Sequence, residues 1–277
     1  MSRCARLPAA VGGKLALAGK ADSKMKTMFQ LHNKIALVTG AATGLGQAIA
    51  VALAGSGAEL AISDKSSESL IETDAALRSL GRKALSIAID VRDLDQVRAG
   101  VAAVMEQLGR IDILVNNAGI NRPTPGLEVT PEVWEDHFNT NVRGGFFMAQ
   151  AVARGMMERK WGRIIFISSQ SGLIGIPGQP VYCATKGAVI QLVRTLGVEW
   201  AKCGITVNSI APTFVETNMT RQRLNDPKFR QFVLGKIPCG QLAQREHVAA
   251  AAVYLASEEA AMVNCETHRV DGGWTAW

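Results

Sequence analysis

The chain has 277 residues, of which 48% are hydrophobic and 19% are charged, a composition typical of a globular protein with one large α/β domain or two small ones. Its formal net charge is +6, but residues 1–27 hold six basic side chains against one acidic side chain, so residues 28–277 are close to neutral. A nucleic-acid-binding protein needs its positive charge on the folded body, so this distribution argues against a nucleic-acid partner.

Residues 1–27 are basic, rich in alanine and poor in acids. We interpret them as a flexible N-terminal extension, and a mitochondrial transit peptide is the alternative. No apolar run approaches the roughly 18–20 residues that a membrane-spanning helix needs, so we expect no membrane partner. The five cysteines are scattered and odd in number, which predicts neither a disulfide framework nor a metal site and fits a reducing, cytoplasmic setting.

Short β-branched segments alternate with longer amphipathic segments along the rest of the chain. The predicted strands cover residues 34–40, 59–64, 83–91, 111–119, 163–169, 205–212 and 268–273. The first four begin about 25 residues apart, the spacing of strand–helix–strand units with right-handed crossovers. No linker divides residues 28–277, so the sequence predicts one domain with a Rossmann fold: a doubly wound parallel sheet of about seven strands with helices on both faces.

The pattern becomes irregular after the sixth predicted strand. Residues 213–245 carry helical segments interrupted by Pro227 and Pro238. The binding crevice of an α/β sheet lies outside the carboxyl ends of its strands, so we predict that this segment is a substrate lid. A surface excursion without a role is the alternative.

A glycine-rich segment follows the first predicted strand directly and leads into a predicted helix. Glycines allow a sharp turn and a close approach to a ligand, and a helix N-terminus offers free N–H groups and a positive dipole end. This arrangement predicts a site for the pyrophosphate of a dinucleotide. The residues that we expect to contact the cofactor here are Gly40, Thr43, Gly44, Leu45 and Gly46.

Two acidic residues end the second and third predicted strands. Asp64 can accept hydrogen bonds from an adenosine ribose and would repel a 2′-phosphate, which favours NAD over NADP. The neighbouring Lys65 could tolerate a phosphate, so NADP remains open. Asp90 and Val91 could lie beside the adenine, and a helix N-cap or turn is the structural alternative for Asp64.

Tyr182 and Lys186 are four residues apart, so on a helix they share one face. An ammonium group near a phenol favours the phenolate, which lowers the pKa of the tyrosine and makes it a usable proton donor and acceptor. A structural pair on the surface is the alternative, because this spacing is common.

The ordered motifs resemble the short-chain dehydrogenase/reductase family over about residues 29–277. They are the glycine-rich segment, the NNAG sequence at 116–119, Asn141, Ser169 and the Tyr182–Lys186 pair. The ending VDGGWTAW and Arg122 are similar to the branch that contains gluconate 5-dehydrogenase and 2-deoxygluconate 3-dehydrogenase.

The resemblance implies a role for each residue of the catalytic group. Tyr182 would be the general acid/base, and Ser169 would hydrogen-bond the same substrate oxygen. Lys186 would bind the nicotinamide ribose, and Asn141 would hold a water in a proton relay. The resemblance also implies that the cofactor is lined by Asn117, Ala118, Gly119, Tyr182, Lys186 and Pro212.

Three positions depart from the family pattern. Thr213 follows Pro212 where glycine is usual, which affects the turn beside the nicotinamide amide. Gln241 replaces a usual arginine, and Asn264-Cys265 replaces a glycine-containing pair in a region that usually contacts another subunit. A homotetramer is implied by the resemblance alone.

The substrate is indicated by fewer residues. Arg122 follows the fourth predicted strand and could pair with a carboxylate, which favours a sugar acid or polyol as the substrate. The alternative is a 3-oxoacyl-thioester reductase with the same catalytic residues. A non-catalytic NAD-binding scaffold is the third interpretation, and the intact set Asn141, Ser169, Tyr182 and Lys186 argues against it.

Overall fold

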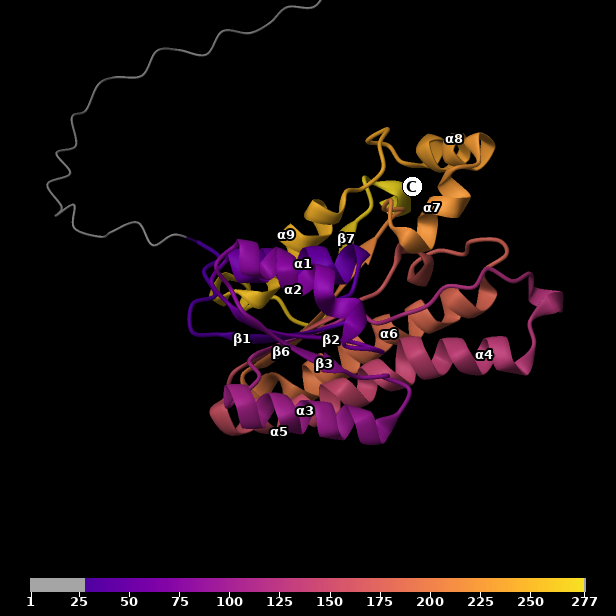
Figure 1. The fold of residues 1–277 in the computed structure, drawn as a ribbon. Helices are drawn as coiled ribbons and strands as arrows, with labels where there is room; N and C mark the ends of the chain where they lie inside the picture. The colour runs from indigo at the N-terminus through magenta and orange to yellow at the C-terminus, as the bar shows by residue number, and fades with distance from the viewer. Residues whose placement is uncertain (1–27, 277) are drawn as a thin grey trace, which may run out of the picture.

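A single parallel sheet of seven strands forms the centre of the computed structural model, which describes residues 28–276 (Figure 1). The predicted flexible extension at residues 1–27 lies outside the described residues. The strands are β1 Ile35–Thr39, β2 Glu59–Asp64, β3 Ala84–Ala88, β4 Ile113–Asn116, β5 Gly162–Ile167, β6 Ile205–Pro212 and β7 Thr267–Val270. Each coincides with a predicted strand, so the predicted doubly wound fold is confirmed.

The strand order is β3-β2-β1-β4-β5-β6-β7. Val38 of β1 pairs with Ile62 of β2 on one side and with Val115 of β4 on the other. All five residues of β1 are buried, as expected for a strand that helices cover on both faces. The chain reverses its direction of winding between β1 and β4, and a crevice forms outside the carboxyl ends of strands at such a switch point.

Helices cover both faces of the sheet. One face carries α1 Gly44–Gly55, α2 Ile71–Ser79 and α9 Arg245–Ala256, and the other carries α3 Leu94–Leu108, α5 Gly145–Arg159 and α6 Pro180–Trp200 (Figure 1). Each layer buries its own hydrophobic cluster of mainly Ala, Val, Ile and Leu. Asp93 caps α3 by accepting two backbone N–H groups, and Gly109 ends it with a φ of 84°.

A helical segment with an unusual middle connects β4 to α5. Helix α4, Pro131–Phe138, continues into a π-helical turn, η3, at Asn139–Gly144. Short 3-10 turns complete the chain at Glu68–Leu70, Gly126–Glu128, Gln170–Gly172, Ala201–Cys203, Glu258–Ala260 and Trp274–Ala276.

The predicted lid segment forms two short helices, α7 Asn218–Leu224 and α8 Pro227–Lys236, which stand clear of the two helical layers near the C-terminus (Figure 1). Pro227 does not break a helix but begins α8, at the first position, where a missing N–H costs nothing. Phe214 stacks on Trp274, with ring centroids 5.7 Å apart. The base of the lid is closed by a β-bridge between Val215 and Ala243.

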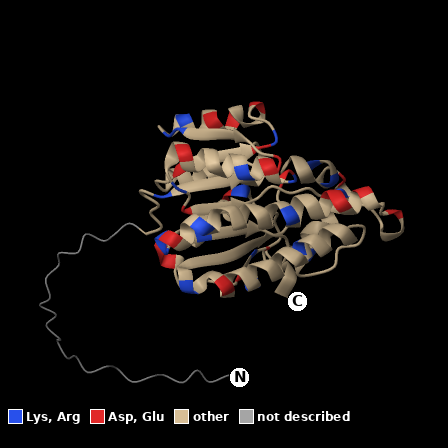
Figure 2. Cartoon of the chain, turned by 90° about the horizontal axis from the view of Figure 1, so that it is seen from below, with Lys and Arg blue, Asp and Glu red and all other residues tan. Residues whose placement is uncertain are grey.

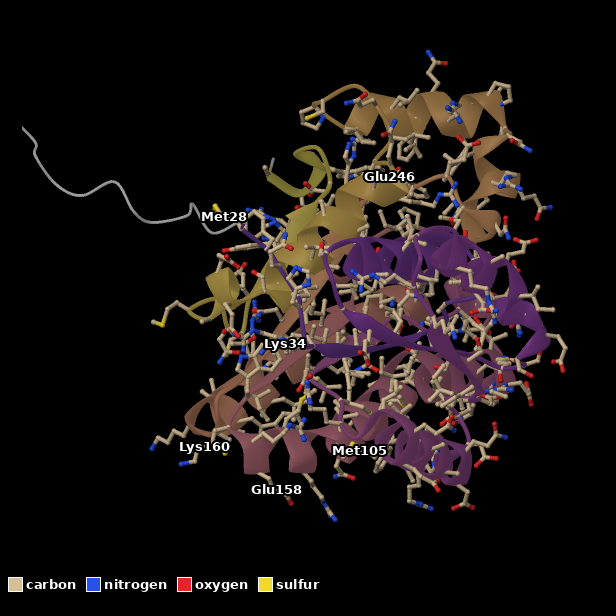
Figure 3. All side chains as sticks on the ribbon, turned by 60° about the vertical axis from the view of Figure 1, so that its left-hand side comes forward. Met28, Lys34, Met105, Glu158, Lys160 and Glu246 are labelled. Atoms are coloured by element: carbon tan, nitrogen blue, oxygen red, sulfur yellow. The ribbon has the colours of Figure 1, made fainter. Side chains whose placement is uncertain are left out.

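The opposite end of the sheet, where β1 and β5 begin, is closed by charged and aromatic side chains. Figure 3 shows Lys34 and Lys160 on this side of the molecule. The Lys34 ammonium lies 3.4 Å from the centre of the Trp161 ring and 3.1 Å from a carboxylate oxygen of Glu258. Because the carboxylate also accepts the Trp161 indole N–H, these contacts tie the start of β5 to the chain that follows α9.

Charges of both signs are interspersed on the side of the body that Figure 2 shows, which agrees with its near-neutral composition. Among the described residues, no helix is both long enough and apolar enough to cross a membrane.

Among changes at the start of the sheet, we expect removal of the Asp112 carboxylate to reduce the free energy of unfolding the most. This side chain is 7% exposed and accepts the Ile35 N–H and the Arg110 Nε–H, each over 2.9 Å. Asp112→Ala leaves a buried N–H unpaired, so the free energy of unfolding should fall by about 2–3 kcal/mol. Urea unfolding measures the change.

The control for this prediction is Asp95→Ala, because Asp95 is 90% exposed although it pairs with Arg98 over 2.6 Å. An exposed ion pair contributes little, so the control should lose less than about 1 kcal/mol. Equal losses in the two variants would contradict the prediction.

Candidate active site

A cleft of about 260 Å³ lies at the carboxyl edge of the sheet, beside the switch point between β1 and β4. Nine of the predicted cofactor residues line it: Gly40, Thr43, Gly44, Leu45, Asp64, Val91, Asn117, Ala118 and Gly119. The structure therefore brings together residues from four strand ends that are up to 79 positions apart in the sequence.

The glycine-rich turn is shaped by two residues with left-handed backbone and by close packing. Gly40 and Gly44 each have a φ of 63°, and a Cβ on Gly40 would lie 2.8 Å from the Ala118 Cα. Gly46 does not line the cleft, because its Cα faces the Gly40 carbonyl and the Asn117 side chain. Its role in the structure is therefore the close packing of α1 against the turn.

The N-terminus of α1 faces this turn in a form that suits an anion. Its N-cap residue, Thr43, makes no side-chain capping bond, and its first turn contains no acidic side chain. Uncapped N–H groups with the positive end of the helix dipole stabilise a phosphate. These residues fit the pyrophosphate of a dinucleotide.

Asp64 is held against the glycine-rich turn by its carboxylate. One oxygen accepts the Ala42 N–H over 3.1 Å, and the other accepts the Lys65 N–H over 2.8 Å. The Lys65 side chain lines the same cleft. The two opposing determinants of cofactor choice thus lie together in the structure.

The two residues predicted to contact the adenine differ in position. Val91 lines the cleft, but Asp90 does not. The Asp90 carboxylate binds the Arg92 guanidinium, with a shortest distance of 2.7 Å, and this hydrogen bond lowers the pKa of the carboxyl group. The predicted adenine contact of Asp90 stays a prediction, and the carboxylate that would make it is already paired with Arg92.

A smaller cavity of about 110 Å³ adjoins the first and contains the predicted catalytic side chains. Ser169, Tyr182, Lys186 and Pro212 line it. Lys186 is only 5% exposed, and its ammonium donates to the Ile167 carbonyl over 2.7 Å. The Lys186 Nζ lies 5.6 Å from the centroid of the Tyr182 ring.

Burial dominates the ionisation of both residues. Desolvation raises the pKa of Tyr182 to about 12, although a hydrogen bond with Ser169 acts in the opposite direction. Tyr182 is partly exposed as a whole residue, so it is the surroundings of its phenol group that remove water. Desolvation lowers the pKa of Lys186 to about 8. The net shift of the Tyr182 pKa is therefore opposite to the lowering expected from the lysine, because desolvation of the phenol is its largest cause.

The two consecutive serines after β5 have different environments. Ser168 Oγ donates to the Lys186 carbonyl over 3.0 Å, and this hydrogen bond connects the end of β5 to α6. Ser169 Oγ accepts the Ser171 N–H over 3.1 Å and bonds the Tyr182 phenol. Ser169 is thus the serine beside the tyrosine, and its predicted hydrogen bond to the substrate oxygen stays a prediction.

Asn141 lies in the π-helical turn and is 5% exposed. Its Oδ1 accepts the Ile120 N–H over 2.8 Å, and its Nδ2 donates to the Ile120 carbonyl over 3.0 Å and to Thr185 Oγ1 over 3.1 Å. A Cβ on Gly119 would lie 3.2 Å from Asn141 Oδ1 and 3.6 Å from Lys186 Nζ. These three residues converge on one point beside the small cavity.

Comparison with known proteins identifies the family. Residues 40–275 match the family described as enoyl-(acyl carrier protein) reductase, which covers most of the chain. The chain belongs to the short-chain dehydrogenase/reductase family. It is 40% identical over 248 residues to gluconate 5-dehydrogenase of Gluconobacter oxydans, which covers 90% of this chain and 97% of the relative. It is 41% identical over 243 residues to a 3-oxoacyl-[acyl-carrier-protein] reductase of Vibrio harveyi, which covers 88% of this chain and 98% of the relative.

The fold agrees with solved structures of the same family. A gluconate 5-dehydrogenase from Burkholderia cenocepacia, solved in complex with NADP and tartrate, superposes with a TM-score of 0.87. It is 37% identical and covers 90% of this chain and 98% of its own. This short-chain dehydrogenase/reductase is therefore an oxidoreductase by family.

Arg122, the predicted substrate residue, is not brought to either cavity of this dehydrogenase/reductase. Its guanidinium lies 3.3 Å from the Asp136 carboxylate, and its side chain is 57% exposed. Its backbone N–H donates to Nε2 of the buried His137 over 3.0 Å. The residue is thus fixed at the backbone, while its side chain is directed to α4.

The sequence predicted a lid at the crevice but not which of its residues line the site. Thr217 and Met219 line both cavities, and Thr213 lines the small cavity. Helical periodicity placed helices in this segment but gave no signal of which side faces the cleft. Cofactor-side residues Ile89, Ile120 and Thr140 were also missed, because apolar and hydroxyl residues near strand ends carry no distinctive pattern.

Proposed function

We propose that the protein is an NAD(P)-dependent oxidoreductase that interconverts a secondary alcohol and a ketone, with Tyr182 as general acid/base. The observation that carries this proposal is the convergence of Ser169, Tyr182 and Lys186 on one cavity that adjoins the dinucleotide-shaped cleft. Neither cavity alone would indicate the reaction, because the cleft accounts only for cofactor binding and the small cavity only for proton transfer.

The residues of the small cavity divide the work of alcohol oxidation. A bound NAD(P) supplies the acceptor for the hydride that leaves the carbinol carbon. In the oxidation direction Tyr182 takes the hydroxyl proton as the phenolate, and in the reverse direction its phenol gives the proton to the ketone oxygen. Ser169 bonds the phenol and holds the substrate oxygen beside it. The buried ammonium of Lys186 stabilises negative charge on the phenol oxygen.

Asn141 supports this chemistry by holding the backbone beside the small cavity in place. Its amide bonds both backbone groups of Ile120 and the Thr185 hydroxyl, and Thr185 in turn donates to the Tyr182 carbonyl over 2.8 Å. The loop after β4 and the first turn of α6 are thereby held in register. We propose that the same amide orients a water that connects Lys186 to solvent.

A sugar acid or polyol is the proposed substrate. The name of the Gluconobacter oxydans relative and the complex with tartrate of the Burkholderia cenocepacia structure support this class. The second candidate is reduction of a 3-oxoacyl thioester, which the 41% identity to the Vibrio harveyi reductase favours. We propose a cytoplasmic setting from the scattered cysteines. The homotetramer is proposed from family resemblance, and sedimentation of a monomer would contradict it.

A substrate panel tests the function. The purified protein is assayed with NAD and NADP against polyols and sugar acids, and with NADH and NADPH against acetoacetyl-CoA. We expect turnover of at least one polyol or sugar acid. Preferential reduction of acetoacetyl-CoA would favour the second candidate, and cofactor binding without turnover of any substrate would indicate a scaffold.

Cofactor choice gives a separate prediction. We expect kcat/KM for NAD to exceed that for NADP by at least about tenfold, because an ionised carboxylate beside a phosphate dianion in a partly dry cleft is unfavourable by several kcal/mol. The side chain of Lys65 offsets only about 1 kcal/mol of this cost, since it is exposed. In Asp64→Ala the ratio should narrow or reverse.

Steady-state kinetics with both cofactors measures this ratio, and Lys65→Ala is the matched control. Removing the lysine should increase the ratio of kcat/KM for NAD to that for NADP, whereas Asp64→Ala should decrease it. Equal use of NAD and NADP by the wild type would contradict the assignment of Asp64.

A further inference from the structure

Thr213 occupies a position where the family usually has glycine, directly after the proline that ends β6. The structure shows that glycine is not required there. The Thr213 N–H donates to the Val270 carbonyl over 3.1 Å, which extends the pairing of β6 with β7, and its φ is not in the left-handed region. The backbone therefore accepts a side chain without strain, and the threonine adds a hydroxyl group at this point of the fold.

This hydroxyl has no partner in the protein. Thr213 is 7% exposed, and among the described residues nothing forms a hydrogen bond with its buried Oγ1. A buried hydroxyl without a hydrogen bond destabilises the folded state, so such groups are rare unless a ligand or water completes them. The hydroxyl is therefore a candidate contact for a bound molecule.

Thr213 lines the small cavity together with Tyr182 and Lys186. Other polar side chains of that lining are already engaged. Ser168 donates to the Lys186 carbonyl, and the Asn117 amide donates to the Gly40 carbonyl over 2.8 Å. Within the part of the chain that the structure describes, Thr213 carries the one buried side-chain oxygen of this lining that lacks a partner.

The two cavities together determine which group would meet Thr213. They share Leu45, Asn117, Gly119, Thr217 and Met219, so one elongated ligand can occupy both. A dinucleotide with its adenosine ribose at Asp64 and its pyrophosphate at the glycine-rich turn extends its nicotinamide into the small cavity. The polar substituent of that ring is a carboxamide, which offers both a donor and an acceptor to a hydroxyl.

We propose that the Thr213 hydroxyl hydrogen-bonds the carboxamide of the nicotinamide ring and so fixes the orientation of the ring against Tyr182. The inference rests on the proposed function, because it requires a nicotinamide cofactor in the two cavities. It assigns to the substituted residue a contact that glycine could not make.

Binding of NADH and NADPH, followed by fluorescence, tests the proposal without turnover. Thr213→Val keeps the shape of the side chain and removes the hydroxyl. The Kd of the more tightly bound dinucleotide should rise by about five- to tenfold, as expected for one hydrogen bond, while the Kd of ADP-ribose, which lacks the ring, should not change. Thr213→Ser should restore the wild-type Kd.

Thr206→Val is the matched control. Thr206 lies on β6, the strand that Thr213 follows, is 6% exposed and also has a buried Oγ1 without a partner in the described structure, but it lines neither cavity. Both valine variants should raise the melting temperature of the cofactor-free protein, because each removes a buried unpaired hydroxyl. Only Thr213→Val should weaken dinucleotide binding.

The possible outcomes separate the alternatives. An unchanged Kd in a folded Thr213→Val would overturn the proposal and would place the hydroxyl toward the second hollow that Thr213 lines, beside Asp271. An unchanged Kd with an altered substrate KM would assign the hydroxyl to the substrate and would overturn it as well. If Thr213→Val does not fold, an unchanged Kd in Thr213→Ala overturns the proposal. A wild type that binds neither NADH nor NADPH would instead overturn the proposed function.

Discussion

Tyr182→Phe is expected to lower kcat by at least about 10²-fold and to leave the Kd of the dinucleotide nearly unchanged. The phenol is the proposed acid/base of the small cavity, and loss of such a group typically lowers the rate by 10² to 10⁴. The aromatic ring remains, so the wall of the cavity keeps its shape. Steady-state kinetics on a substrate from the panel, together with NADH fluorescence titration, measures both quantities.

Tyr254→Phe provides the control, because the chain has only two tyrosines and this one lies on α9, outside both cavities. Its kcat should stay within about twofold of the wild type. A Tyr182→Phe variant that keeps more than about a tenth of the wild-type kcat would show that another group carries the proton, contrary to the expectation for a lost general acid/base.

The strands could be predicted because their apolar segments are buried on both faces. In β1 every residue from Ile35 to Thr39 is buried, so the sequence shows an unbroken apolar run. The glycine-rich turn was equally readable, since Gly40 and Gly44 adopt a backbone that other residues rarely adopt. Patterns of this kind reflect a requirement of the local backbone, so they are visible in the sequence.

Contacts between distant residues could not be read in this way. No pattern in the sequence shows that Asp136 of α4 holds the Arg122 guanidinium, 14 positions away. Even the contact of Arg92 with the Asp90 carboxylate, two positions away, has no distinctive motif. The π-helical turn at Asn141 also lacks a sequence signal, because it depends on the amide reaching Ile120. These contacts depend on how whole helices and strands pack together.

The expected effect of Lys186 on the tyrosine pKa is opposed by burial in the cofactor-free fold. The spacing of Tyr182 and Lys186 predicted that the lysine charge would act on the phenol. In the folded chain the larger effect is the loss of water around both groups, which opposes ionisation of each. Burial depends on α6 lying against β5, and it cannot be judged from a four-residue spacing.

Lys186→Met should make the protein inactive and, at pH 7, more stable. Burial lowers the pKa of Lys186 from 10.5 to about 8, so keeping the ammonium in the fold costs about 3 kcal/mol below pH 8. Methionine has a similar volume and no charge, but it forgoes the hydrogen bond to the Ile167 carbonyl, about 1 kcal/mol. The net gain in the free energy of unfolding should be about 2 kcal/mol, with kcat reduced by at least about 10²-fold.

The pH dependence of this gain distinguishes buried charge from better packing. Because the pKa of Lys186 in the fold lies below that in the unfolded chain, the unfolded chain binds more protons between pH 8 and 10.5, and wild-type stability rises across that window relative to the variant. The advantage of Lys186→Met should therefore shrink above pH 8, reach zero at about pH 10 and reverse above it, because the lost hydrogen bond to Ile167 then outweighs the remaining cost of the charge. Lys202→Met is the control, because Lys202 is exposed and should show no such dependence. A gain that stays constant from pH 7 to 10 would mean that methionine packs better, and an absent gain at pH 7 would mean that the ammonium is better solvated than its burial indicates.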